Sequence, residues 1–471
     1  MISTLLLPRF EFIIKNSRIN MTSLLQIQSI SPLDGRYYEK VKELTEYFSE
    51  FALIKYRLRV EIEWLIALAG NRKIDSISTF SQTQKGQLRD LYRKFRPQDA
   101  LAIKAIEKIT NHDVKAVEYY INRKLEDLNL EYVNPMVHFA CTSEDINNLA
   151  YGLMLQNALR EIVVPVCQQL LNAIRRNAEK YRKQPMLSRT HGQPASPTTL
   201  GKEFFNVSER LQRQLDQIKS QKILGKMNGA VGNFNAHCIG YPDVDWKKFG
   251  RNFVESLGLT WNPATTQIEP HDYLAEIFHH FIRWNTIVLD FNRDIWSYIA
   301  IGVFKQRIRK GEVGSSTMPH KINPIDFENS EGNLGIANAL MEYLAAKLPI
   351  SRWQRDLSDS TTLRNVGLVF GYSILAYKST LKGIDKLAID KKKIENDLQD
   401  SWLILGEALQ TVMRKHKIPD SYEKLKALTQ GKDIDQKTLK NFLYTLDLPK
   451  DVIEQLEKLT PSSYLGYATE F

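Results

Sequence analysis

The chain has 471 residues, of which 43% are hydrophobic and 25% are charged, and its formal net charge is +10. This length exceeds one ordinary core, so we expect two to four domains, and the composition excludes a disordered chain. Charges of both signs are interspersed and no apolar run is long enough to cross a membrane, so we expect no nucleic-acid or membrane partner. Three widely spaced cysteines are typical of a reducing, cytoplasmic compartment.

Residues 1–20 stand apart from the rest of the chain. The leucine run Leu5–Leu7 is interrupted by Pro8 and Arg9, and no basic segment precedes a long apolar centre. The stretch is therefore a poor signal peptide. We expect residues 1–20 to be a disordered N-terminal extension, with Met21 as a candidate start.

Helical periodicity dominates the remaining chain. Turn residues at 31–37 lead into a helix, and residues 51–130 predict several helices of ordinary length. Beyond them, apolar residues recur at three- and four-residue steps, which predicts an elongated bundle of long helices. Apolar side chains also lie off the main stripe, which indicates packing against other subunits. The five predicted long helices cover residues 155–174, 200–218, 274–299, 325–347 and 361–385.

Polar motifs interrupt these helices in the first third of the chain. Arg36 beside Tyr37 could hold a phosphate, and Asn111-His112-Asp113 fits a helix N-terminus that faces a ligand. Thr142-Ser143 before two acids starts another helix and could receive an anionic group. Each motif is equally compatible with a simple capped turn, and the pattern alone does not decide.

Later motifs favour proton transfer and anion binding. His191 lies in a segment with Gly192 and Pro194, which predicts an irregular stretch where an imidazole can face a cleft. A histidine with a purely structural role is the alternative. Residues 225–233 are glycine-rich without the spacing of a phosphate loop, so we expect a close-packed turn. The segment 352–364 combines arginines with hydroxyls, which suits an anion clamp or a solvated helix start.

The loop Gly314–Pro324 is the most informative stretch. It contains two serines, a lysine, an imidazole and an amide between glycines and prolines, so it predicts a connection between helices rather than a helix. A loop with so many donors suits an anion, and its lysine can hold a carboxylate as a point charge.

The order of residues in this loop resembles the signature of the fumarase/aspartase superfamily, whose members eliminate fumarate from succinyl-type substrates. Further blocks extend the resemblance from about residue 31 to near the end of the chain, and they favour the branch that cleaves adenylosuccinate and SAICAR. These blocks lie at 31–37, 110–119, 138–148, 188–195, 266–273 and 351–360.

The resemblance implies an all-α, three-domain fold with a central long-helix bundle. We place an N-terminal helical domain at 21–131, the bundle domain at 132–385 and a C-terminal helical domain at 386–471. The resemblance also implies a homotetramer whose active sites are each shared among three subunits. The implied reaction is β-elimination of fumarate from adenylosuccinate, giving AMP, and from SAICAR, giving AICAR.

The resemblance assigns His191 as general acid and Ser315 as general base. Breaking a C–N bond requires a base for the carbon-bound proton, an acid for the departing nitrogen and cations for the developing charge, but no metal or organic cofactor. A serine hydroxyl is a weak base, so Lys321 and loop amides are candidates for ionising it. The residues implied to bind substrate are Arg36, Tyr37, Asn111, His112, Asp113, Thr142, Ser143, Gln267, Ser316, Lys321, Asn323, Asn329, Arg355, Ser360, Thr361, Thr362, Leu363 and Arg364.

Three alternatives remain at this point. The nearest is another fumarate-releasing member of the superfamily, acting on argininosuccinate, aspartate or malate, although the blocks at 110–119 and 351–364 argue against it. The second is a basic helical scaffold that binds nucleic acid through its +10 charge. The third is an inactive homologue, although every proposed catalytic residue is present.

Overall fold

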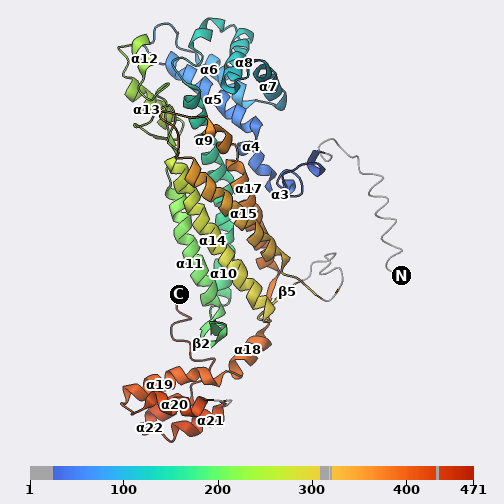
Figure 1. The fold of residues 1–471 in the computed structure, drawn as a ribbon, viewed down its shortest axis with the longest axis vertical. Helices are drawn as coiled ribbons and strands as arrows, with labels where there is room; N and C mark the ends of the chain where they lie inside the picture. The colour runs from blue at the N-terminus through green and yellow to red at the C-terminus, as the bar shows by residue number, and fades with distance from the viewer. Residues whose placement is uncertain (1–24, 308–317, 319–320, 431–433) are drawn as a thin grey trace, which may run out of the picture. The chain divides into compact units, whose positions relative to one another are not determined.

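The computed structural model of the chain describes residues 25–307, 318, 321–430 and 434–471 (Figure 1). The predicted extension at 1–20 and the predicted site residues Ser315 and Ser316 lie outside these described residues. The all-α prediction is confirmed, because the strands within the described residues form only three short two-stranded sheets. None of the described helices combines the length and apolar character that crossing a membrane requires.

The chain divides into two compact units. The first comprises residues 1–163, 222–278 and 336–375, and the second comprises residues 164–221, 279–335 and 376–471. Three long helices contribute residues to both units, namely α14 (Asp272–Ala300), α15 (Ile325–Lys347) and α17 (Val366–Lys386). The predicted division into three domains at residues 131 and 385 remains a prediction.

The first unit is built around α5 (Glu50–Ala69), whose start is capped by Ser49 and which is buried over most of its length. Trp64 of this helix is fully buried and packs edge-on against Phe253, with 5.0 Å between ring centroids. The other elements of this unit are α3 (Tyr38–Val41), η1 (Lys42–Leu44), α4 (Thr45–Phe48), α6 (Gln82–Arg93), α7 (Pro97–Thr110), α8 (Asp113–Asp127), η2 (Glu131–Met136), α9 (Ser143–Ala158), the π-turn η3 (Leu159–Val163), β3 (Leu224–Gly225), α12 (Asn235–Gly240), α13 (Trp246–Ser256), β4 (Thr260–Trp261) and α16 (Ser358–Leu363).

The second unit contains the bundle predicted from the long apolar stripes. Helices α10 (Val164–Lys180) and α11 (Leu200–Ser220) lie side by side (Figure 1), and Phe204 of α11 meets Phe291 of α14 at 5.7 Å between ring centroids. Asn292, Ser330 and Thr380 form a buried hydrogen-bonded group that joins α14, α15 and α17.

A smaller helical cluster completes the second unit. It has its own core, to which Leu409, Met413 and Leu443 contribute. Its elements are α18 (Lys391–Gln399), η4 (Trp402–Leu405), α19 (Gly406–Lys415), α20 (Ser421–Thr429), α21 (Gln436–Leu443) and α22 (Lys450–Glu457), and the short strands β5 (Phe304–Gln306) and β6 (Leu387–Ile389) pair just before them.

Two local predictions were wrong. The segment around His191 is not irregular, because β1 (Pro185–Thr190) and β2 (Gln193–Thr199) pair as an antiparallel hairpin with His191 and Gly192 at its turn. The helix predicted over 361–385 is broken at Arg364, which separates α16 from α17. Proline in both strands and glycine at the turn explain why the hairpin looked irregular from sequence.

Candidate functional site

A pocket of about 530 Å³ opens in the first unit where α8 and α9 begin. His112 is the N-cap of α8 and accepts a hydrogen bond at Nδ1 from the Lys115 N–H, at 3.0 Å. Thr142 precedes α9, and its N–H donates to the Asp145 carboxylate at 2.9 Å. Two helices begin at the pocket, and the positive end of each helix dipole favours an anion there. The pocket brings together three predicted residues, His112, Thr142 and Ser143.

His138 is a pocket residue that the sequence reasoning did not assign. Its Nδ1 lies 2.6 Å from the buried Glu61 carboxylate, and its Nε2 lies 3.9 Å from Glu118. Burial disfavours the charged ring, but the negative charge of Glu61 outweighs burial and raises the pKa of His138. Burial also raises the pKa of Glu61, so the pair keeps its proton to a higher pH than a free imidazole would. The only signal in the sequence was its position at the head of the 138–148 block.

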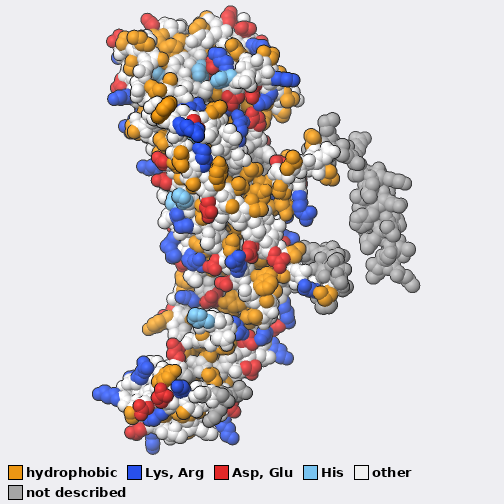
Figure 2. Space-filling view, in the orientation of Figure 1, with side chains coloured by type: hydrophobic (Ala, Val, Ile, Leu, Met, Phe, Trp, Pro, Cys, Tyr) orange, Lys and Arg blue, Asp and Glu red, His pale blue; other side chains and the backbone are white. Residues whose placement is uncertain are grey.

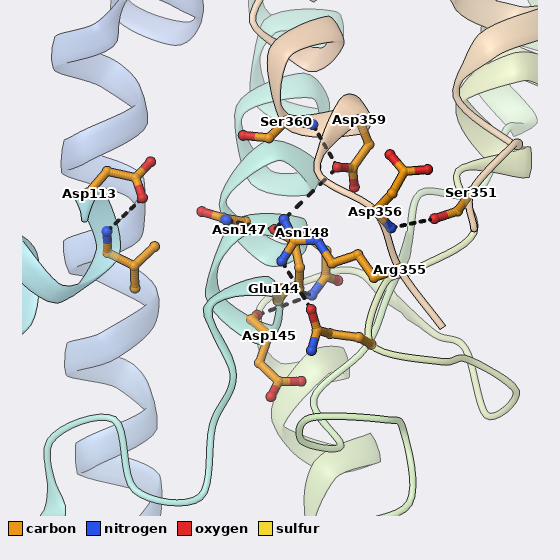
Figure 3. A network of polar contacts seen from close by, with 12 residues as sticks. Asp113, Glu144, Asp145, Asn147, Asn148, Ser351, Arg355, Asp356, Asp359 and Ser360 are labelled. Atoms are coloured by element: carbon orange, nitrogen blue, oxygen red, sulfur yellow. Dashed lines mark hydrogen bonds and ion pairs between the residues drawn. The ribbon is translucent and has the colours of Figure 1, made fainter. Parts of the chain in front are cut away.

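A buried polar network joins predicted site residues from separate parts of the chain (Figure 3). Arg57 of α5 pairs with Asp113 at 2.7 Å and donates through Nε to Asn147 at 2.8 Å. Asn147 donates to Glu144 at 2.7 Å. Burial would raise the pKa of Asp113, but the charges of Arg57 and Arg364 outweigh it and hold this pKa below its usual range.

The same network continues to the segment 351–364 (Figure 3). Arg355 donates to Glu144 at 2.9 Å and to Gln267 at 3.2 Å, and it lies 3.9 Å from Asp359. His271 lies 3.5 Å from the other Asp359 oxygen. Burial alone would raise the pKa of Asp359, but the polar contact with His271 and the charge of Arg355 outweigh burial and lower this pKa. The network thus brings together Asp113, Gln267 and Arg355, and their predicted role in substrate binding stays a prediction.

The glycine-rich stretch 225–233 is a close-packed turn, as expected. Gly232 has φ +81°, and a Cβ there would lie 2.4 Å from the Thr265 carbonyl oxygen, so only glycine fits. Lys226 pairs with Asp145 at 3.0 Å, and both side chains are fully buried. The N–H groups of Asn228 and Gly229 donate to the same carboxylate. Asp145 therefore ties this turn to the start of α9, where Thr142 and Ser143 line the pocket.

The other predicted residues of the first unit lie at the edges of helices. Arg36 is exposed, with its guanidinium 5.8 Å from the Tyr37 ring centroid, and Asn111 ends α7 in a left-handed conformation. Arg364 pairs with Glu50 at 2.6 Å and Asp113 at 3.3 Å. Within α16, Ser360 is half-buried and Thr361 is exposed. The side chains of Thr362 and Leu363 are buried, and Leu363 lines a small pocket of about 80 Å³ together with Arg364.

The second unit holds the remaining predicted residues. His191 is exposed at the hairpin turn with φ +52°. Lys321 is exposed and Asn323 half-buried just before α15, whereas Asn329 is half-buried within that helix. The described residues hold no group of three or more metal-ligating side chains.

Comparison with known proteins first defines the class. A family model described as lyase matches residues 35–338. A fumarate lyase from Mesorhizobium aligns with a TM-score of 0.72 at 17% identity, covering 91% of this chain and 96% of that one. A β-carboxy-cis,cis-muconate cycloisomerase from Acinetobacter calcoaceticus aligns at 0.71 and 20% identity, covering 92% and 97%. The chain therefore has the fold of the fumarase/aspartase superfamily, as the signature loop predicted.

Relatives of higher identity narrow the assignment within that class. A model described as adenylosuccinate lyase C-terminal matches residues 351–465. An adenylosuccinate lyase of Haemophilus influenzae is 53% identical over 448 residues, covering 95% of this chain and 98% of that protein. An adenylosuccinate lyase of Escherichia coli is 52% identical over 446 residues, covering 94% and 98%. The chain belongs to the adenylosuccinate lyase family.

Proposed function

We propose that this protein is an adenylosuccinate lyase of purine nucleotide biosynthesis. It is a carbon–nitrogen lyase that releases fumarate from adenylosuccinate, giving AMP, and from SAICAR, giving AICAR. The observation that carries this proposal is the identity of 52–53% to adenylosuccinate lyases over nearly the whole chain. Lyases that act on argininosuccinate, aspartate or malate are not favoured, because the segment 351–465 matches the adenylosuccinate lyase C-terminal model.

The pocket in the first unit supports binding of an anionic substrate. Two helix starts supply positive potential where Thr142 and Ser143 can donate hydrogen bonds. In this proposal His112 and Asp113 hold the substrate from the start of α8, while Gln267 contributes an amide.

Proton transfer in this proposal uses His191 of the second unit and Ser315, which lies outside the described residues. Ser315 removes the proton from the carbon beside the carboxylate, and His191 protonates the departing nitrogen. Lys321 stabilises the carboxylate whose negative charge grows in the intermediate. Positioned acids and bases contribute about 10²–10⁴-fold each, so electrostatic stabilisation by the cationic loop carries a large share of catalysis.

We further propose a cytoplasmic homotetramer whose active sites are each completed by three subunits. Large apolar side chains that remain exposed on the long helices support self-association, among them Trp296 of α14 and Tyr343 of α15. Figure 2 shows hydrophobic side chains gathered over α15 and α17 on the visible face. The sparse cysteines favour a reducing compartment.

The direct test is to follow purine absorbance while the purified protein turns over adenylosuccinate, with fumarate and AMP identified by chromatography. Stoichiometric fumarate and AMP are expected. A folded protein that leaves adenylosuccinate intact but releases fumarate from argininosuccinate would overturn the proposal.

A further inference from the structure

The hairpin of residues 185–199 presents His191 at its turn. Thr190 and Gln193 pair across the strands, and His191 and Gly192 between them have φ +52° and +76°. Two consecutive positive φ values are typical of a type I′ turn, which is costly for a residue other than glycine. A two-stranded hairpin is marginally stable by itself, so the direction of the His191 ring depends on what holds the hairpin base.

Residues 464–471, which we call the closing segment, hold both ends of that base. At the entrance, Arg182 donates through Nε to the Thr469 carbonyl at 2.8 Å and through Nη2 to the Phe471 carbonyl. At the exit, the Thr199 hydroxyl donates to the Ala468 carbonyl at 3.0 Å. The closing segment therefore contacts the hairpin from a point more than 260 residues away in sequence.

Aromatic packing fixes the closing segment in place. The Phe471 ring stacks on Phe205 of α11, with 4.4 Å between centroids and an interplanar angle of 20°. The Arg182 guanidinium also lies over the Phe471 ring, 4.8 Å from its centroid. Arg182 thus makes two hydrogen bonds to backbone oxygens of the closing segment and one cation–π contact with it. An arginine that is only solvated at the surface makes no such set of contacts with a single segment.

The helices that follow the bundle hold the strands themselves. Glu407 of α19 accepts hydrogen bonds from Ser196 of β2 and from Tyr464 of the closing segment, the latter at 3.0 Å. On the other strand, Arg189 lies 3.6 Å from Asp397 of α18. The hairpin is therefore held at its base and along both strands, while its turn is exposed.

We infer that Arg182 and the closing segment are a positioning device for the His191 imidazole. This inference rests on the proposed role of His191 as general acid. A displacement of a reacting group by about 1 Å can cost about 10²-fold in rate, so a loosened hairpin base lowers turnover even when the protein stays folded. Arg182 and Phe471 act through His191 and touch no substrate.

The test compares Arg182→Met with Arg210→Met. Arg210 pairs with Asp290 on the bundle at 2.7 Å, and its side chain is 32% exposed compared with 31% for Arg182, so it controls for the loss of a half-buried arginine. We expect Arg182→Met to lower kcat about tenfold with little change in KM, since the acid is misplaced by a fraction of 1 Å. We expect Arg182→Lys to recover part of the loss and Arg210→Met to keep kcat.

A double-mutant cycle separates positioning from general destabilisation. If Arg182 acts through His191, adding Arg182→Met to His191→Gln lowers kcat by no more than about twofold beyond His191→Gln alone. Losses that multiply would overturn the inference, as would wild-type kcat in Arg182→Met. Wild-type kcat in His191→Gln would instead refute the proposed acid and the inference with it. If Arg182→Met does not fold, Phe471→Ala is measured in the same cycle, and the association state of every variant is determined.

Discussion

The buried pair of Asp145 and Lys226 provides a quantitative test of how the pocket is held. The two side chains are 0% exposed, and their charged atoms lie 3.0 Å apart. Their remaining partners differ in number. Asp145 also accepts from the N–H groups of Thr142, Asn228 and Gly229 at 2.9 to 3.1 Å, whereas Lys226 donates in addition to the Gly229 carbonyl at 2.9 Å.

This difference predicts unequal costs for removing either partner. Breaking a buried ion pair by removing one member costs about 3–5 kcal/mol. Lys226→Met leaves a carboxylate that keeps its backbone donors, so we expect the lower figure of about 3 kcal/mol. Asp145→Asn leaves a buried ammonium with one carbonyl, so we expect about 5 kcal/mol. Asp145→Asn also loosens Thr142 at the pocket, so its KM rises more.

Urea unfolding followed by tryptophan fluorescence measures both costs at one fixed protomer concentration. The matched control is Arg251→Met, which removes an exposed ion pair with Glu255 at 2.8 Å and should cost less than about 1 kcal/mol. The reasoning is refuted if Lys226→Met destabilises the protein as much as Asp145→Asn, or if both variants fall within the range of the control.

Three further predictions concern other parts of the site. Glu144→Gln removes the charge that holds Arg355, so KM for adenylosuccinate should rise about tenfold, as expected for a lost charged hydrogen bond. The control Glu63→Gln, at a half-buried contact with Arg89, should leave KM unchanged. His138 has a raised pKa, so its contribution to stability is complete below about pH 6.5 and is lost as the pH rises through that raised pKa. The urea midpoints of wild type and His138→Gln should therefore converge at alkaline pH. A difference between the two midpoints that does not change with pH would contradict this. Ser315→Ala should abolish turnover, but the variant should still bind adenylosuccinate in calorimetry. If active sites are shared between subunits, mixing Ser315→Ala with inactive His191→Ala subunits should restore some activity. No recovery of activity after subunit exchange would count against shared sites.

The fold could be predicted largely because apolar spacing reports the buried side of a helix. Leu211 and Leu215, predicted from their spacing, are fully buried in α11. The hairpin could not be predicted in the same way, since Pro194 and Pro197 interrupt any strand pattern and its stability comes from distant contacts. The closing segment that holds Thr199 lies 269 residues further along the chain.

The helix starts among the candidate site residues were predictable from local polar motifs, as at His112 and Thr142. The ion pairs of the network were not predictable, because their partners lie far apart in sequence. Arg57 is 56 residues from Asp113, and Glu144 is 211 residues from Arg355. A single charge within an apolar helix has no local pattern, and only the folded structure shows which opposite charge it meets.

The charges of the first unit also bear on how the proposed site attracts its anionic substrate. Arg355 was expected to clamp an anion, yet its Nη atoms are bonded to Glu144 and Gln267. Lys115 in the pocket is balanced by Glu118 at 2.6 Å, and His138 is balanced by Glu61. Adenylosuccinate carries a phosphate and two carboxylates, so a pocket whose cations are already paired gains little from Coulomb attraction. In the proposed site, cations that have no partner within the pocket therefore carry the attraction for these anionic groups, and Lys321 of the signature loop is the candidate for this role.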